Sequence, residues 1–270
     1  MARQPEDPAA RLRAAQAMAA CPTGSIRTEA PCPEAREAAA SFPFAVDEAG
    51  LPGVSHLGFH AAHSYGAASW FLEGTGAGNV MVDCPRFNSQ LARRLEARGG
   101  VDWIVLTHRD DVADHARWKA RFPGARRVIH RLEVNARQGT DACEIILDGD
   151  GPHWAPFTRG ESPGGGDTLR VVFTPGHTGG SVTLSYARGD GALFTGDHLA
   201  FQVGLGRVGG FRRACWYSWD EQVRSVERLA DLDGTFLHVL PGHGAPHRFA
   251  SRDAQVAELR AAAGAMAAQR

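Results

Sequence analysis

The chain has 270 residues, of which 43% are hydrophobic and 22% are charged, the balance of an ordinary globular protein. Its 29 basic and 30 acidic side chains leave a formal net charge of −1, which gives no electrostatic reason to expect nucleic acid or an anionic membrane as a partner. No apolar run approaches the roughly 18 residues of a membrane span, and the N-terminus has no apolar core of a secretory signal. We therefore expect a cytoplasmic protein without a membrane partner, whose five unpaired cysteines are free thiols.

Residues 1–45 are expected to form an N-terminal appendage to a main domain of residues 46–270. A short helix is predicted over residues 11–20, and several prolines interrupt the rest of the appendage. From about residue 55 onward, apolar strands alternate with amphipathic helices. The predicted strands are 69–73, 79–83, 103–107, 127–130, 169–174, 182–186, 192–195 and 236–240, and the predicted helices are 89–98, one ending near 122, 219–231 and 252–269. Residues 149–166 are rich in loop-forming residues, and Pro163–Gly166 is expected to be a flexible stretch. Mixed strands and helices of this kind predict α/β layers.

Four of these strands run directly into a short polar turn that carries histidine or aspartate. The four segments are Val105-Leu-Thr-His108, Phe173-Thr-Pro-Gly-His177, Leu193-Phe-Thr-Gly-Asp197 and Val239-Leu-Pro-Gly-His243. Strand ends hold side chains with the precision that a metal site requires, and a glycine before the ligand allows a tight turn. Isolated histidines would not fall repeatedly at this point, so the pattern indicates a metal centre.

The residue types in these turns indicate which metals could bind. Imidazole and carboxylate without cysteine suit zinc, iron or manganese better than a thiolate site would. Seven or eight candidate ligands are too many for one tetrahedral ion, but they suit two ions bridged by a carboxylate. Such a pair can generate hydroxide at neutral pH and stabilise the oxyanion that its attack creates.

The motifs resemble those of the metallo-β-lactamase superfamily, especially its glyoxalase-II-like branch. The matching pieces are Val82-Asp83, Thr107-His108 with Asp114-His115, Gly176-His177-Thr-Gly-Gly-Ser181, Thr195-Gly-Asp197 and Pro241-Gly-His243. The resemblance implies an αββα sandwich with the metals at one edge between two β-sheets. It also implies that His108 and His177 hold the first metal, that Asp197 bridges, and that His243 and His115 serve the second. Asp83 would orient loops or ligands through hydrogen bonds without binding metal.

The chain departs from the family in the second motif. The usual pattern is His-x-His-x-Asp-His, whereas this chain reads His108-Arg-Asp-Asp-Val-Ala-Asp-His115. Alternation along the strand places Asp110 on the same side as His108, so we expect Asp110 to approach the first metal. A helix starting near Asp110 would put Asp111, Asp114 and His115 on one face, with Asp114 and His115 toward the second metal. The alternative is that Asp110 or Asp111 is only a helix N-cap. The extra carboxylates favour iron or manganese relative to zinc.

The N-terminal cysteine motif raises a separate question. Cys21-Pro-Thr-Gly-Ser-Ile26 resembles the closing piece of a ferredoxin-like module, in which Cys-Pro supplies the last cluster ligand. The upstream Cys-x-x-Cys group is absent, and one cysteine cannot hold a cubane cluster. We therefore expect a remnant of such a segment or a truncated gene start, without an iron–sulfur cluster.

The resemblance implies a hydrolase with a small-molecule substrate, in which metal-bound hydroxide attacks a thioester, lactone or related ester. Two divalent ions are expected, with zinc first and iron or manganese as competitors. The catalytic candidates are Asp197, which could hold the nucleophile or take its proton, together with Asp114 and His115. Candidates for substrate contacts are His130, Arg212, Arg213, Trp216 and Tyr217, although residues 211–217 could equally form a solvated surface loop. The alternatives are a di-iron redox protein or sulfur dioxygenase-like oxidoreductase on the same fold, and a non-catalytic binding module.

Overall fold

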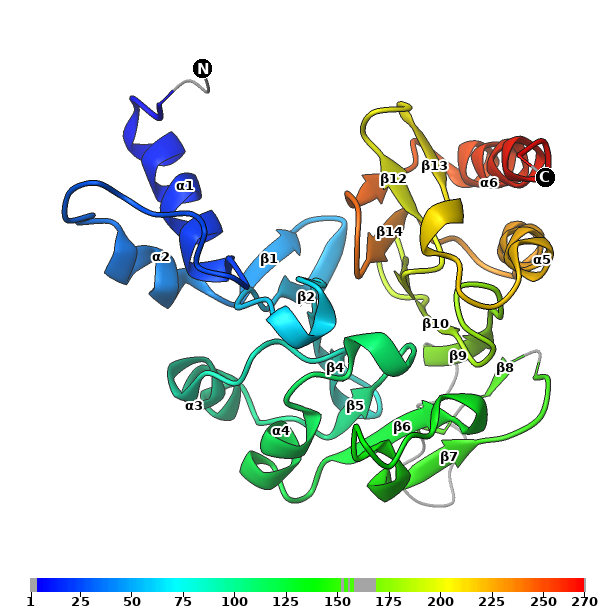
Figure 1. The fold of residues 1–270 in the computed structure, drawn as a ribbon, viewed down its shortest axis with the longest axis horizontal. Helices are drawn as coiled ribbons and strands as arrows, with labels where there is room; N and C mark the ends of the chain where they lie inside the picture. Colours follow the sequence, from blue (N-terminus) through cyan, green and yellow to red (C-terminus); the bar gives the residue numbers. More distant parts are fainter. Residues whose placement is uncertain (1–3, 152, 155, 158–168, 270) are drawn as a thin grey trace.

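The computed structural model describes residues 4–151, 153–154, 156–157 and 169–269, so the Pro163–Gly166 run lies outside the described residues. Two β-sheets pack against each other, and helices cover their outer faces (Figure 1). This arrangement confirms the expected α/β sandwich. No helix among the described residues is long and apolar enough to cross a membrane.

The first sheet has seven strands that lie in chain order. They are β1 (Phe44–Asp47), β2 (Leu51–His56), β3 (Trp70–Thr75), β4 (Gly78–Val82), β5 (Trp103–Val105), β6 (Arg126–His130) and β7 (Ile145–Leu147). Strands β1 to β4 pair antiparallel, whereas β4 to β7 pair parallel. Parallel neighbours need crossover connections. The helix α3 (Ser89–Ala97) connects β4 to β5, α4 (His115–Arg121) connects β5 to β6, and residues 131–144, with two short 3-10 turns, connect β6 to β7.

The second sheet has six strands, in the spatial order β15-β14-β11-β10-β9-β8. They are β8 (His153–Trp154), β9 (Leu169–Phe173), β10 (Val182–Tyr186), β11 (Ala192–Gly196), β14 (His238–Pro241) and β15 (His247–Arg248). Only the β11–β14 pair is parallel, and its crossover includes the hairpin β12 (Ala200–Gln202) and β13 (Arg207–Gly209) and the helix α5 (Trp219–Ala230). The last helix, α6 (Arg252–Ala267), packs beside α5.

Alternation along the strands divides the interior into three apolar clusters. Val80 and Val82 of β4 point between the sheets, whereas Met81 points toward α3 and α4. Residues of β9, β11 and β14 pack on their outer side against α5 and α6. Because both faces of each sheet are covered, these strands are continuous apolar runs, which is why the sequence showed them so clearly.

The N-terminal segment consists of two helices, α1 (Pro8–Ala20) and α2 (Ala35–Ser41), that pack against each other. They lie at one side of the first sheet (Figure 1). Phe42, which follows α2, is buried against Phe59, and its carbonyl accepts a hydrogen bond from Arg94 of α3. β1 then joins the sheet at Phe44. A boundary at residue 45 therefore stays a prediction.

The predicted elements were longer than the observed ones at the ligand turns. The strand expected at 103–107 ends at Val105, and the helix expected from near Asp110 begins only at His115. Between them lies the 3-10 turn η2 (Arg109–Asp111). The other 3-10 turns are η1 (Ala62–Ser64), η3 (Arg131–Glu133), η4 (Thr140–Ala142) and η6 (Arg212–Ala214). The elements that the sequence did not reveal are α2, β1, β2, β7, β8, β12, β13 and β15, and all of these except α2 and β2 have four residues or fewer.

Candidate metal centre

The ligand turns after β5, β9, β11 and β14 meet at one edge of the sandwich. The Nε2 atoms of His108 and His177 lie 3.8 and 3.7 Å from Asp197 Oδ2. His243 comes from the turn after β14, and its Nδ1 lies 2.7 Å from Asp197 Oδ1. Asp197 is therefore the one side chain that contacts the other three.

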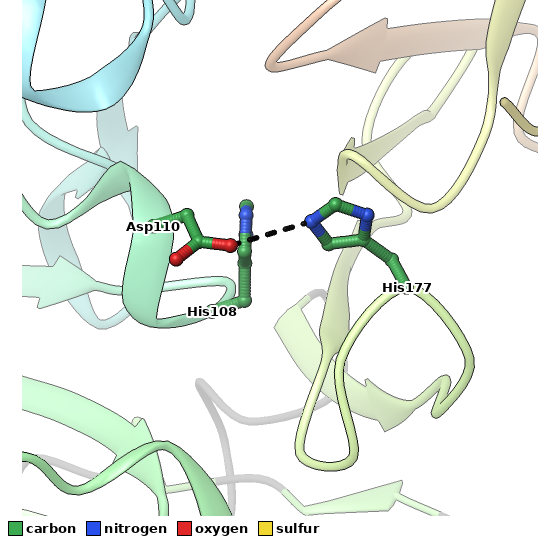
Figure 2. Close-up of side chains that lie close together, drawn as sticks. All are labelled: His108, Asp110 and His177. Carbon is green, nitrogen blue, oxygen red and sulfur yellow. Dashed lines mark ion pairs between the residues drawn. The ribbon is translucent and has the colours of Figure 1, made fainter. Parts of the chain in front are cut away.

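His108, Asp110 and His177 form the first group of potential ligands (Figure 2). Asp110 and His177 point toward each other from the two halves of the sandwich, with His108 beside them. His177 Nε2 lies 3.7 Å from Asp110 Oδ2, and one ligand atom from each of the three residues lies within 4.8 Å of the others. The Nε2 atoms of both histidines are buried and have no hydrogen-bond partner among the described residues. Buried nitrogens without a partner are costly, and a metal ion would satisfy both.

Asp111 belongs to a second group, with His108 and Asp197. Its side chain is fully buried, and neither carboxylate oxygen has a hydrogen-bond partner among the described residues. Burial raises the pKa of Asp111 well above its usual value, and the neighbouring carboxylates of Asp197 and Asp83 raise it further. A buried carboxylate next to other carboxylates is stable as an anion only if a cation lies among them. The residues present therefore fit a second metal ion.

Asp114 and His115 do not face this centre, contrary to the expectation from the sequence. Asp114 accepts a hydrogen bond from the Phe87 amide at 2.7 Å, and its carboxylate lies 3.5 Å from Arg117. The ring nitrogens of His115 contact the Gln138 carbonyl at 2.8 Å and Arg127 at 3.2 Å. The reason is the backbone: η2 ends after one turn, and Asp114 adopts a left-handed conformation with φ of 53°. Residues 111, 114 and 115 therefore never share a helical face, and Asp111 alone turns inward.

Asp83 supports the turn that carries His108. Its carboxylate accepts hydrogen bonds from the Thr107 amide at 2.8 Å and from the Thr107 hydroxyl. Because the hydroxyl donates to Asp83, its oxygen is free to accept from His108 Nδ1, 3.0 Å away. A proton on Nδ1 leaves the lone pair of Nε2 facing the first group. Burial raises the pKa of Asp83 to about 7.

Comparison with known proteins identifies the family. The model of the metallo-beta-lactamase superfamily matches residues 65–243. A hydroxyacylglutathione hydrolase from Acidiphilium cryptum (strain JF-5) is 34% identical over 201 residues, which cover 70% of each chain. A beta-lactamase-like protein 2 homolog from Caenorhabditis elegans is 26% identical over 64% of this chain, and the match spans 55% of that protein.

The chain belongs to the metallo-β-lactamase superfamily. It is a metal-dependent hydrolase of the glyoxalase-II-like branch, as the motifs indicated. A solved metallo-beta-lactamase family protein from Thermus thermophilus has the same fold, with 22% identity, a TM-score of 0.51, and coverage of 81% of this chain and 79% of that one. A metallo-beta-lactamase from Hirschia baltica, 16% identical, covers 73% of this chain and 85% of its own length with a TM-score of 0.50.

Both ligand groups adjoin a cavity of about 830 Å³, because Asp110, His177 and Asp197 line it. Arg213 and Trp216, which were expected to contact substrate, line it, together with Arg109, Tyr65 and Phe211, which the sequence did not single out. Tyr217 is exposed outside the lining, and the Arg212 guanidinium lies over the ring of Trp219 instead. His130 is buried against Phe173 and bonds the Gly149 carbonyl, so it does not face the cavity.

Glu133 is a further residue of the site that the sequence did not reveal. Its buried carboxylate accepts a hydrogen bond from the Gly180 amide at 2.6 Å and one from the Arg109 amide at 3.0 Å. Arg109 lies between His108 and Asp110, and Gly180 belongs to the turn that carries His177. One carboxylate therefore joins the two ligand turns of the first group. A Cβ on Gly180 would lie 2.8 Å from Glu133, so the motif's glycine is needed for this contact.

The His177 turn is also held from its other side, by α5 and the segment before it. Ser225 of α5 donates to the Pro175 carbonyl at 2.8 Å, and the Trp216 amide donates to the His177 carbonyl at 2.8 Å. Gly176 has φ of +150°, and a Cβ there would lie 2.3 Å from Gln222 Cα. Only glycine allows the turn to approach the helix so closely.

Proposed function

We propose that this chain hydrolyses a thioester, lactone or related ester of a small organic acid. The observation that carries the proposal is the set of buried, unpartnered ligand atoms of His108, His177 and Asp111. His177 lines an open cavity, and His108 and Asp111 group with Asp197, which also lines it. The hydroxyacylglutathione hydrolase relative, a protein named for a thioester substrate, supports the thioester as the first class to test.

His108, Asp110 and His177 would hold one metal ion, Asp111 and His243 would hold the other, and Asp197 would lie between the two. When bound, such ions polarise a carbonyl and supply hydroxide at neutral pH. His243 has its Nδ1 toward Asp197 and its Nε2 3.2 Å from the Tyr65 carbonyl, which fixes the ring at the cavity edge. Asp83, through Thr107, and Glu133, through Arg109, would fix the position of the turn that carries His108 and Asp110.

The walls of the cavity indicate the shape of the substrate. Arg213 and Arg109 line the cavity, and the Arg109 Nε also lies 3.6 Å from Glu133 Oε2. A guanidinium group in this lining can bind a carboxylate or phosphate of the substrate in a bidentate manner. Trp216, Phe211 and Tyr65 offer aromatic surface, which excludes water from an apolar part of the substrate. An anionic ester with an apolar or sulfur-containing portion fits both features.

For the metals, we propose two divalent ions, with zinc first. Asp110 stands where the family has a histidine, and Asp111 adds a further carboxylate, so iron and manganese compete more strongly here than at a histidine-rich site. The same carboxylates are the observation that favours the second candidate function, a di-iron oxidoreductase on this fold.

Anaerobic purification with elemental analysis, followed by a panel of thioesters and lactones, tests both proposals. We expect about two ions per chain and turnover of at least one class of ester. Two irons with redox activity and no hydrolysis would establish the oxidoreductase instead.

Variants of the Asp-rich turn test the ligand assignment. We expect Asp110→Asn and Asp111→Asn each to weaken metal binding about 10–100-fold, because both lose a charged oxygen close to the ions. Asp114→Asn is the matched control and should retain the full metal content, since its carboxylate bonds Phe87 and Arg117. Loss of metal in Asp114→Asn with none in Asp111→Asn would overturn the assignment.

A further inference from the structure

A second cluster of potential ligands lies at the other end of the second sheet. It consists of Asp47 at the end of β1, Asp190 in the turn between β10 and β11, and His238 at the start of β14. Asp197 and His243 follow the opposite ends of β11 and β14. His243 follows His238 by five positions, along β14 (His238–Pro241) and the turn after it, so the two clusters lie on the order of 15 Å apart. The second cluster contributes nothing to the cavity lining.

The three side chains converge on one point. His238 Nε2 lies 3.7 Å from Asp47 Oδ2 and 4.0 Å from Asp190 Oδ2. The other oxygen of Asp47 is already fixed, because it accepts hydrogen bonds from the Gly50 amide at 2.9 Å and the Ala49 amide at 3.2 Å. Asp47 Oδ2 is therefore the atom that is turned toward His238.

His238 is the observation that points to a ligand. Its side chain is only 5% exposed, and Nε2 has no hydrogen-bond partner among the described residues. Burial lowers the pKa of the ring, and the nearby carboxylates of Asp47 and Asp190 act in the opposite direction. A buried nitrogen aimed at two carboxylate oxygens, too far from either for a hydrogen bond, leaves space for a cation between them.

Arg248 supplies a positive charge next to the two carboxylates of this cluster. Its Nη2 lies 2.6 Å from Asp190 Oδ2, and its Nε lies 3.8 Å from Asp47 Oδ2. The single guanidinium balances only one of the two carboxylate charges. Among the described residues it also leaves His238 Nε2 without a hydrogen-bond partner. The Arg248 side chain is 52% exposed, so it can move into solvent at small cost.

We propose that Asp47, Asp190 and His238 bind a divalent cation of the zinc type, and that Arg248 competes with this ion for the two carboxylates. Two carboxylate oxygens and one imidazole nitrogen form a three-residue ligand set for zinc, with water as the fourth ligand. Zinc bonds of about 2.0–2.2 Å place neighbouring ligand atoms about 3.4 Å apart in a tetrahedron. The carboxylate oxygens of Asp47 and Asp190, now 3.7 and 4.0 Å from His238 Nε2, need to approach that nitrogen by roughly 0.3–0.6 Å. The bound ion joins the β1–β2 turn of the first sheet to β11 and β14 of the second.

Equilibrium dialysis against zinc, with the ions per chain counted by elemental analysis, tests this site. In the 270-residue chain we expect one ion beyond those of the catalytic centre. His238→Gln and Asp190→Asn should each lose that ion while keeping kcat, since neither residue touches the cavity. Two different variants guard against a folding defect in one of them. The extra ion should also raise the Tm of the native chain, and this rise should be absent from both variants.

Arg248→Gln gives the sharper test because it should strengthen zinc binding, whereas the His238 and Asp190 variants should weaken it. Removal of the competing charge should tighten binding of the extra ion by about 10-fold or more. Arg260→Gln, which removes an exposed arginine paired with Asp231, is the matched control and should change nothing. Equal zinc content and affinity in the native chain, His238→Gln and Arg248→Gln would refute the site. That result would leave the catalytic proposal intact, because hydrolysis is measured separately.

Discussion

At the scale of single residues, buried carboxylates decide how the metal centre is assembled. Asp83 acts on His108 through Thr107, and Glu133 bonds the main chain of both turns of the first ligand group. Neither points an oxygen into the cavity in any described contact. We propose that both orient the candidate ligands through these hydrogen bonds, a role whose loss usually weakens metal binding about 10–100-fold.

Glu133→Gln tests this role. Glutamine has one acceptor oxygen where glutamate has two, so one of the Arg109 and Gly180 amides loses its partner, at a cost of about 1–3 kcal/mol for a buried group. We expect the variant to fold, with metal affinity reduced at least about 10-fold and the visible spectrum of the cobalt-substituted protein altered.

Glu144→Gln is the control for this variant. Glu144 is also hydrogen-bonded, by Arg127, but it lies at the edge of the first sheet and touches neither ligand turn. An unchanged cobalt spectrum in Glu133→Gln, with the same loss of Tm as in Glu144→Gln, would show that Glu133 is merely structural.

At the scale of elements, the catalytic edge depends on how closely α5 approaches the His177 turn. The helix begins at the N-cap Ser218, whose side chain accepts from the Glu221 amide, and its apolar face packs on β9, β11 and β14. Helix and turn then meet at Gly176. The His177 turn and α5 therefore pack without space between them, and a Cβ added at Gly176 would displace His177.

Gly176→Ala should prevent this packing. The added Cβ would lie 2.3 Å from Gln222 Cα, and the backbone conformation is one that alanine rarely adopts. We expect a loss of several kcal/mol of stability or failure to fold, measured by Tm and soluble yield.

Gly264→Ala in α6 is the contrasting variant, since nothing lies within 4 Å of its Cβ position. It should stabilise the protein by about 0.5–1 kcal/mol through helix propensity alone. A normal Tm and full metal content in Gly176→Ala would mean that α5 does not constrain the turn.

At the scale of the whole molecule, the N-terminal helices lie beside the first sheet, which also supplies the turn that carries His108. Residues of the N-terminal segment contact the domain at Phe42, and the Ala20 carbonyl accepts the His60 amide at 3.0 Å. Pro22 also lies against Gly66, next to the Tyr65 loop. The segment therefore contacts the domain without supplying a residue to either ligand group.

Deletion of residues 1–30 should leave the metal centre occupied. Because β1 and Phe42 are retained, we expect a lower Tm, caused by the exposed surface that α1 covered, but unchanged metal content by elemental analysis. Loss of metal on this deletion would show that the segment is part of the catalytic domain.

The sequence by itself determined the family and the sandwich, and it predicted the four turns that carry the candidate ligands, because those signals are local. Strands buried on both faces are continuous apolar runs, and each one ends in a glycine or threonine followed by the ligand residue. The short edge strands β1, β7 and β15 carried too few residues to show a period.

Only the tertiary structure decided which carboxylates of the Asp-rich turn point inward. A regular helix from Asp110 would place Asp111 and His115 on one face. Asp114 instead adopts a left-handed backbone conformation, so Asp111 and His115 point in different directions. His115 then bonds Arg127, and Glu133 reaches back over 24 residues to Arg109. The cluster of Asp47, Asp190 and His238 comes from three distant segments of the chain. Such contacts depend on how separate elements pack, and no repeating pattern along the chain encodes them.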